Sequence, residues 1–363
     1  MDRSKWEYKK LSEVSMITMG QSPSSDSYNE EGIGLPFYQG NADFGVLHPK
    51  ARVFCDTPQR EANANDILMS VRAPIGAINI ADAHCCIGRG LCAICPKKGT
   101  LDLMYLYYFL ISKNDYLNQQ GTGSTFKSIG KKTIFDLSIP VPSVEDQQII
   151  SGEINCLNEM IALKQKQLKE FDKLAQSIFY DMFGDPISNE KGWGKLKMKD
   201  ICEIIAGGDK PDNLSDIKTD DYCYPVIANG DGDKGILGYS RTRRVVKDSV
   251  TIGARGASIG NCRIVYGGFT PVVRLISITP NDQVNCIYLY YFAKQMPYFS
   301  TGAGQAQLTV PNVKMVTIPL PPLELQQQFA EKIQAIEAQK ELVKKSIAET
   351  QQLLDSRMDY YFN

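Results

Sequence analysis

The chain has 363 residues, of which 43% are hydrophobic and 22% are charged, a composition typical of a soluble globular protein with room for two domains. Its 40 Lys and Arg residues against 41 Asp and Glu leave a formal net charge of −1, so any case for nucleic-acid binding depends on local clusters. No apolar run reaches the ~20 residues that span a bilayer, and the N-terminus lacks the apolar segment of a signal peptide. We therefore expect a cytoplasmic protein with no membrane association.

The chain consists of two similar halves. Trp6 and Trp193 lie 187 residues apart, and this offset shortens to 179 near the end of each half, as loops of different length would produce. Three segments in the first half have counterparts in the second: Arg72–Gly76 and Arg255–Gly260, Tyr105–Phe109 and Tyr288–Phe292, Ile139–Pro142 and Ile318–Pro321. Two copies of one fold present two similar but non-identical surfaces. A duplicated enzyme or structural protein would show the same repeat.

Two segments of the first half could contact a polar ligand. Arg72 precedes a Pro-Ile-Gly turn, and an arginine there could bind phosphate or guanine, or could form a structural ion pair. The glycine-rich loop that follows lacks apolar bulk, so its hydroxyls and backbone N–H groups should face solvent, phosphates or base edges. The candidate residues in and after this loop are Thr122, Ser124, Thr125, Lys127 and Lys131.

A cluster of cysteines in the first half imitates a zinc site. His84, Cys85 and Cys86 precede Cys92 and Cys95, which have zinc-ligand spacing. The repeat places ordinary strand residues at the corresponding positions of the second half, so we expect buried thiols and no metal. The Tyr105–Phe109 segment could stack on bases. A helix packed on a sheet is the favoured interpretation.

A heptad pattern follows each Ile-Pro-x-Pro segment. Since proline prevents a helix from extending backwards, each helix should begin just after that segment. The first pattern predicts a helix from about Val144 to Phe183, ~60 Å long at 1.5 Å per residue, with Lys164 as a polar intruder in the seam. The second pattern is weaker, since Lys340, Thr350 and Arg357 interrupt it. Antiparallel pairing of the two helices would bury both stripes and place the globular parts at opposite ends. Pairing between two chains is the alternative.

The second half offers its own candidates. Arg255 is the counterpart of Arg72, and Gln305 and Gln307 lie in the second polar loop. Arg241, Arg243 and Arg244 form a dense basic cluster that could contact phosphates or simply cover a solvated strand face. The acidic stretch from Asp209 to Asp233 could face away from DNA or supply an acceptor for cytosine N4.

Two globular regions, each followed by Ile-Pro-x-Pro, a Gln-Gln pair and a heptad helix, resemble the specificity subunit of Type I restriction–modification systems. The resemblance covers essentially the whole chain. It implies an α+β fold with two tandem mixed target-recognition domains, each followed by a long helix, and the two helices paired as an antiparallel coiled coil. The corresponding boundaries are 1–142 and 185–321 for the recognition domains and 143–184 and 322–363 for the helices.

The resemblance also implies a function and partners. Each recognition domain would read one half of a bipartite double-stranded DNA target. The helices would recruit two methyltransferase subunits, and restriction subunits could join the assembly. S-adenosylmethionine, ATP and Mg²⁺ would belong to those partners, which leaves this chain without a cofactor, a metal or a catalytic role. The residues that would contact the methyltransferase are the glutamine pairs Gln147, Gln148, Gln326 and Gln327.

The sequence contains no P-loop and no amino-methyltransferase signature, which agrees with a chain that has no catalytic role. A coiled-coil scaffold whose duplicated domains bind proteins or small ligands is the alternative from another class. The detached recognition part of a self-contained restriction–methylation enzyme would read DNA in the same way with a different partner.

Overall fold

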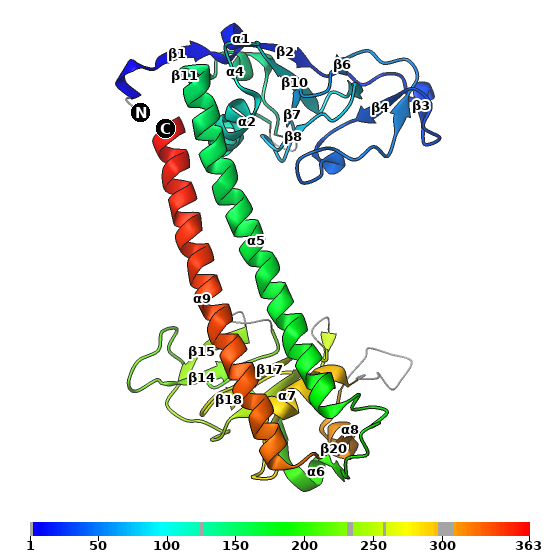
Figure 1. The fold of residues 1–363 in the computed structure, drawn as a ribbon, viewed down its shortest axis with the longest axis vertical. Coiled ribbons are helices and arrows are strands. Elements are labelled where there is room, and N and C mark those ends of the chain that lie inside the picture. Colours follow the sequence, from blue (N-terminus) through cyan, green and yellow to red (C-terminus); the bar gives the residue numbers. More distant parts are fainter. Residues whose placement is uncertain (1–2, 124–126, 231–234, 257–258, 297–307) are drawn as a thin grey trace. The chain divides into compact units, whose positions relative to one another are not determined.

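The computed structural model describes residues 3–123, 127–230, 235–256, 259–296 and 308–363. The chain forms two compact units: residues 1–164 with 346–363 (unit 1) and residues 165–345 (unit 2). Each unit combines β-sheets and short helices with one half of each long helix, α5 (Val144–Phe183) and α9 (Leu323–Phe362) (Figure 1). The α+β fold predicted from the sequence is confirmed.

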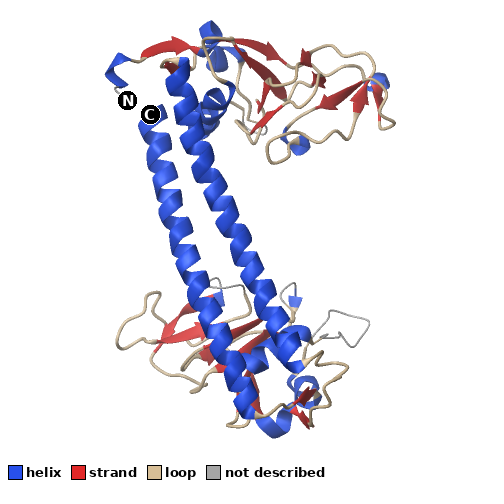
Figure 2. Ribbon diagram, in the orientation of Figure 1, coloured by secondary structure: helices blue, strands red, loops and turns tan. Residues whose placement is uncertain are grey.

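Unit 1 contains two sheets and a two-stranded ribbon (Figure 2). The first sheet is antiparallel, in the order β2 (Ser15–Met19), β10 (Leu91–Pro96), β7 (Ile67–Ser70) and β8 (Ile78–Ile80). The second has the order β3 (Tyr28–Asn29), β5 (Phe54–Cys55), β4 (Leu35–Tyr38), β9 (Cys85–Ile87) and β6 (Glu61–Ala62), with β4 and β9 parallel. The ribbon pairs β1 (Glu7–Lys10) with β11 (Ser138–Val141).

Short helices connect these strands. They are α1 (Leu11–Val14), α2 (Leu103–Ser112), α3 (Asn114–Gln119) and α4 (Lys131–Phe135), with 3₁₀ turns η1 (Arg3–Lys5), η2 (Ser25–Ser27) and η3 (Asn41–Asp43). Helix α2 begins at Asp102, whose carboxylate accepts a hydrogen bond from the backbone N–H of Tyr105 at 2.9 Å. An aspartate cap satisfies one of the N–H groups that a helix start leaves open.

Unit 2 repeats the main sheet of unit 1. Its four-stranded sheet has the order β13 (Cys202–Ala206), β19 (Leu275–Pro280), β16 (Ser249–Gly253) and β17 (Cys262–Val265). A three-stranded sheet orders β15 (Ile236–Ser240), β14 (Tyr224–Ile227) and β18 (Thr270–Pro271), and β12 (Lys195–Lys197) pairs with β20 (Thr317–Pro319). The short helices are α6 (Met198–Ile201), α7 (Cys286–Gln295) and α8 (Val310–Met315). The repeat seen in the sequence is therefore a repeat of topology.

The core of each unit lies between its four-stranded sheet and the helices. Strands β7 and β16 are buried along their whole length, as expected of inner strands covered on both faces. Tyr105 in α2 and Tyr288 in α7 are fully buried, and their hydroxyls donate to the carbonyls of Pro140 at 2.9 Å and Pro319 at 2.6 Å. The aromatic segment is thus a core helix in both halves, as predicted.

The two long helices pack together in antiparallel orientation inside each unit. In unit 1, Ile150, Ile154, Leu157 and Ile161, which follow the heptad spacing of four and three residues, are buried. The polar intruder Lys164 donates to Ser346 Oγ at 2.8 Å and to Thr350 Oγ1 at 2.9 Å. In unit 2, Lys340 is 14% exposed and pairs with Asp172 and Glu337, each at 2.8 Å. Polar seam residues with specific partners fix the register of a helix pair.

Each long helix ends in the core of the unit in which the other one begins. Phe183, at the end of α5, packs on Tyr288 and Phe329 in unit 2, with ring centroids 4.8 and 5.2 Å apart. Phe362, at the end of α9, packs on Tyr105 of unit 1 at 5.2 Å. Each unit therefore needs residues from both halves of the sequence. No helix in the described part of the chain is long and apolar enough to cross a membrane.

Candidate nucleic-acid interface

In unit 1 the arginine turn and the polar loop lie side by side. Arg72 forms an isolated antiparallel bridge with Ser128, and Ser128 forms a second one with Thr122. The N–H of Ala73 donates to the carbonyl of Lys127 at 3.1 Å, which ties the loop to the turn. Arg72, Thr122 and Lys127 are all exposed. Two segments about fifty residues apart in the sequence thus form one basic surface.

Two asparagines of α3 hold this turn from behind. Asn118 donates to the carbonyl of Ile75 at 2.9 Å, and Asn114 donates to the carbonyl of Gly76 at 3.1 Å. Because buried carbonyls of a turn need donors, these bonds fix the backbone that carries Arg72. Lys131 begins α4 nearby in the sequence, with its Nζ 4.6 Å from the centre of the Phe135 ring.

In unit 2 the corresponding arginine borders a cavity. Arg255 is exposed, and its carbonyl accepts a hydrogen bond from Asn229 Nδ2 at 2.8 Å. With Arg274, Gly207 and the start of α8, it lines a cavity of about 570 Å³. The backbone setting matches unit 1, because Leu308 donates to the carbonyl of Ala254 at 2.9 Å, as Ile129 does to Val71 at 3.0 Å.

The cluster of Arg241, Arg243 and Arg244 is exposed, but its members point to different places. The guanidinium groups of Arg241 and Arg243 each lie 4.8 Å from a tyrosine ring centre, over Tyr222 and Tyr224. Arg241 Nη2 is also 3.4 Å from Asp221, so part of the acidic stretch neutralises this cluster.

Arg244 has a different neighbour. Its Nη1 lies so close to Gly208 that a methyl group on that residue would approach it to 2.5 Å. Gly208 follows Gly207, which lines the cavity beside Arg255 and Arg274. Arg255 and Arg274 therefore share one cavity, whereas Arg244 lines another, smaller cavity with Glu203 and Lys247. Arg274 is absent from the predicted set because the first half has no arginine at the aligned position. Ser124, Thr125, Gln305 and Gln307 lie outside the described residues.

The predicted role of the glutamine pairs needs correction at one member of each pair. Gln147 has no exposed surface, accepts from the N–H of Asp102 at 2.8 Å and donates to the carbonyls of Thr100 and Pro142 at 3.0 and 2.9 Å. Gln326 is equally buried and makes the corresponding bonds to Asn285, Gln283 and Pro321. Both amides have their hydrogen bonds made within one unit, so they offer no surface to another subunit.

The outer members of the two pairs are placed differently. Gln148 and Gln327 are exposed, and their contact with a methyltransferase stays a prediction.

The cysteine cluster is distributed over two strands. Cys85 and Cys86 lie in β9 and Cys92 in β10, all three buried. Burial raises the pKa of the Cys92 thiol to about 12. His84 pairs with Glu61 at 2.7 Å. The described residues contain no group of three or more His, Cys, Asp or Glu side chains arranged to hold a metal ion.

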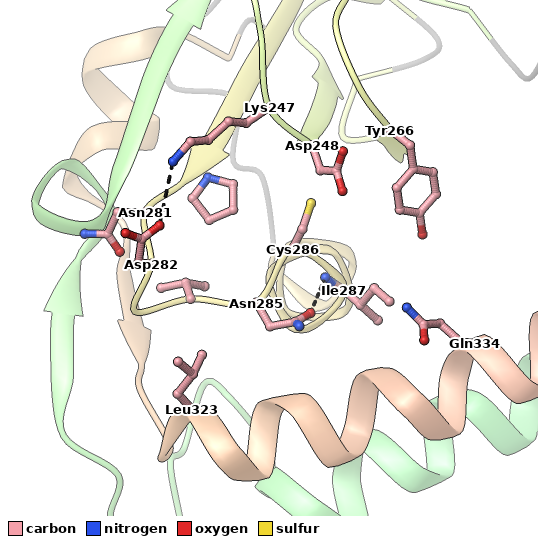
Figure 3. Close-up of a pocket in the computed structure, with 12 residues that line it drawn as sticks. Lys247, Asp248, Tyr266, Asn281, Asp282, Asn285, Cys286, Ile287, Leu323 and Gln334 are labelled. Atoms are coloured by element: carbon pink, nitrogen blue, oxygen red, sulfur yellow. Dashed lines mark hydrogen bonds and ion pairs between the residues drawn. The ribbon is translucent and has the colours of Figure 1, made fainter.

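A second cavity of unit 2, of about 510 Å³, lies beside the start of α7 (Figure 3). Lys247 points across it to Asp282, with Nζ 3.6 Å from the carboxylate, and Asp248 lies on the same wall. Burial raises the pKa of Cys286 in this cavity to about 12. With one lysine against two aspartates, the lining does not favour phosphate. Lys247 also lines a smaller cavity with Arg244, so only its ion pair with Asp282 belongs to the cavity beside α7.

Comparisons with known proteins agree on one family. The model of the Type I restriction modification DNA specificity domain matches residues 3–173 and again residues 190–352. The MjaIX type I restriction enzyme specificity subunit of Methanocaldococcus jannaschii is 26% identical over 376 aligned positions, which cover 91% of this chain and 86% of that protein. The crystal structure of a Type I system S subunit from M. genitalium is similar in fold, with a TM-score of 0.63 at 17% identity, over 99% of this chain and 96% of that one.

Other relatives match over shorter stretches. A second M. jannaschii protein is 39% identical over 162 residues, 45% of this chain, but only 38% of its own length is covered. A Mycoplasma pneumoniae protein is 31% identical over 207 residues, with 56% of its length covered. The match to the family model spans both halves of the chain and most of its residues. The protein belongs to the Type I restriction modification DNA specificity domain family.

Proposed function

We propose that this chain is the DNA-reading subunit of a Type I restriction–modification complex and carries no catalytic step itself. Residues 1–142 and 185–321 would each read one half of a bipartite duplex target. The observation that carries this proposal is the repeated arginine turn. Arg72 and Arg255 are exposed in equivalent backbone settings, each beside a further cationic side chain: Lys127 in unit 1 and Arg274 in unit 2.

The charge of these sites suits DNA although the whole chain is nearly neutral. Guanidinium groups bind phosphate oxygens and guanine edges with two parallel hydrogen bonds. Local concentration of such groups is sufficient for binding, because counterion release depends on the phosphates contacted and not on net charge. A scaffold that binds only proteins gives no reason for the same arginine in the same exposed turn of both units.

The long helices support recruitment of two copies of one partner. Leu163 and Leu342 are equivalent in the repeat and are 66% and 62% exposed, and Leu174 and Leu353 are equivalent and 47% and 46% exposed. Each unit thus presents one leucine of each kind. Exposed leucines that recur at equivalent positions are typical of a protein contact surface. We propose that each unit binds one methyltransferase subunit through them, and that S-adenosylmethionine, ATP and Mg²⁺ act on the partner subunits.

In unit 1, three further exposed side chains of α5 extend the surface that the exposed leucines form. Ile149, Cys156, Met160 and Leu163 are exposed and separated by seven, four and three residues, so they share one side of α5. Restriction subunits would join the same complex.

DNA binding tests the proposal directly. The full chain, alone and with its methyltransferase, is mixed with fluorescent random-sequence duplexes at several salt concentrations. We expect salt-dependent binding and enrichment of one interrupted sequence, which should reappear as the methylated site when host DNA is mapped with and without the gene. A chain that binds no duplex in either state would refute the proposal and favour the protein-binding scaffold.

A further inference from the structure

A second turn lies beside the arginine turn in each unit. In unit 1 it joins β9 to β10. The carbonyl of Gly90 accepts a hydrogen bond at 2.9 Å from the N–H of Val71, the residue before Arg72. In unit 2 it joins β18 to β19, and the carbonyl of Arg274 accepts from the N–H of Ala254 at 2.8 Å, one residue before Arg255. Gly90 and Arg274 therefore occupy equivalent positions.

The equivalence extends to the next residue of each turn. The carbonyl of Leu91 accepts from the N–H of Gly20 at 2.9 Å, and the carbonyl of Leu275 accepts from the N–H of Gly207 at 2.7 Å. The two turns are thus the same element of the repeat, and each one lies next to an exposed arginine.

Both turns carry an arginine, but one position apart. Unit 1 has Gly88-Arg89-Gly90, whereas unit 2 has Val272-Val273-Arg274. Arg89 and Arg274 are both exposed, and neither side chain forms a hydrogen bond or ion pair with another described residue. Unit 1 cannot place its arginine at position 90, because a Cβ there would lie 2.2 Å from the carbonyl oxygen of Gln39.

Unit 2 holds its arginine in a strained backbone. Arg274 has a φ of +62°, a left-handed conformation that costs a non-glycine residue on the order of 1 kcal/mol. Strain of this kind tends to persist where the side chain is needed. Here the side chain lines the cavity of about 570 Å³ together with Arg255.

We propose that Arg89 and Arg274 are the base-reading arginines of the two units, each donating its fork to the O6 and N7 atoms of a guanine, while Arg72 and Arg255 hold phosphate. This inference rests on the proposed DNA-reading function. The phosphate backbone is the same for every sequence, so its contacts should recur at one position in both units, as Arg72 and Arg255 do. A residue that reads different bases in the two half-sites should differ between the units, as Arg89 and Arg274 do.

Substitutions at Arg274 can separate base readout from phosphate binding. Arg274→Gly removes the guanidinium, and glycine accepts a φ of +62° without strain, so the fold should be kept. Arg274→Lys keeps the charge but loses the planar fork. The test uses the full chain, the duplex that it selects from a random pool, and variants of that duplex changed at one base pair each.

We expect Arg274→Gly to weaken binding to the selected duplex by roughly 10- to 100-fold, and to abolish discrimination at a single G·C pair of one half-site. Arg274→Lys should not restore it. Arg89→Ala should do the same at one pair of the other half-site. Lys199→Ala, an exposed lysine of α6, serves as the control for loss of one positive charge.

Three results would overturn the inference while leaving DNA recognition intact. They are an equal loss of affinity of Arg274→Gly on every duplex, restored discrimination in Arg274→Lys, or unchanged discrimination in both Arg274→Gly and Arg89→Ala. A wild-type chain without sequence preference would instead refute the proposed function. Circular dichroism of each variant identifies any loss of binding that comes from unfolding.

Discussion

At the scale of single residues, two arginines one repeat apart carry the proposal of DNA binding. Removing both, in the variant Arg72→Ala/Arg255→Ala, should weaken binding to all duplexes by a similar factor, because a phosphate contact carries no sequence information. The plot of log affinity against log salt should flatten by about 0.9 for each phosphate that the variant no longer binds. Fluorescence anisotropy at four salt concentrations measures both quantities. Unchanged affinity would remove this turn from the interface.

Thiol reactivity reports on the placement of single residues in unit 1. Cys92 is fully buried with its pKa raised to about 12, so below that pH it stays a protonated, unreactive thiol. Cys156 is exposed on α5. We expect iodoacetamide at pH 8 to label Cys156 in the native chain and Cys92 only after unfolding, as mass spectrometry would show.

The same experiment tests the partner surface. Addition of the methyltransferase should protect Cys156, which shares one side of α5 with Met160 and Leu163. Labelling of native Cys92 would contradict the structure, whereas equal labelling of Cys156 with and without the methyltransferase would contradict only the proposed contact.

Repetition in the sequence identified some of these residues and misled on others. Arg72 and Arg255 were found because the turn is repeated with its arginine in place. Arg274 was missed because the aligned residue in the first half is Gly90, and only the hydrogen bonds of the folded chain reveal that Arg89 lies one position earlier in the equivalent turn. Gln147 and Gln326 were assigned to a partner because repetition shows that a residue is kept, not whether it faces inward.

At the scale of elements, these two glutamines join each long helix to its globular region. Gln147→Leu should destabilise the chain by about 1–3 kcal/mol, since it leaves the Asp102 N–H and two carbonyls without their partner in a buried site. Gln148→Leu, the exposed neighbour, should change the free energy of unfolding by less than about 0.5 kcal/mol. Urea titration followed by circular dichroism measures both. Equal stability of the two variants would show that the amide contributes nothing.

Pattern reasoning predicted the long helices well, because heptad spacing and the preceding prolines are strong local signals. The first helix ends at Phe183, as predicted, but the buried face of its last turns differs from the heptad pattern. The heptad continues through Ile178 and Met182, but Phe179 and Phe183 are the buried residues, since this end packs on a domain core and not only on the other helix. The strands β3, β5 and β6 give no periodic signal, because two residues are too few to show the alternation of a strand.

At the scale of the whole molecule, the length of the helices should set the spacing of the DNA target. One heptad copied into α5 after Lys164 and another into α9 after Lys345 preserve the phase of the seam and lengthen each helix by about 10 Å. We expect the enlarged chain to select the same two half-sites with about three more base pairs between them. Selection from random duplexes checks this prediction.

The matched control inserts two residues at each of these places, which turns the seam by about 200° to the opposite side of each helix. This variant should lose binding to any single spacing. An unchanged spacer in the heptad variant would show that the helices do not measure the distance.

The crossing of the helices between cores also bears on how such a gene can diversify. Phe362 completes the core that contains Tyr105, and Phe183 completes the core that contains Tyr288. Each folded unit therefore contains residues from both contiguous halves of the sequence. Recombination that replaces the segment before Pro142, or the segment between the two long helices, would supply a new recognition domain and leave the two helices unchanged. A foreign recognition domain would then have to match only the helix surfaces that it packs against. Under the proposed function, the turns that contact DNA would remain free to change, so a single genetic exchange would supply a new specificity.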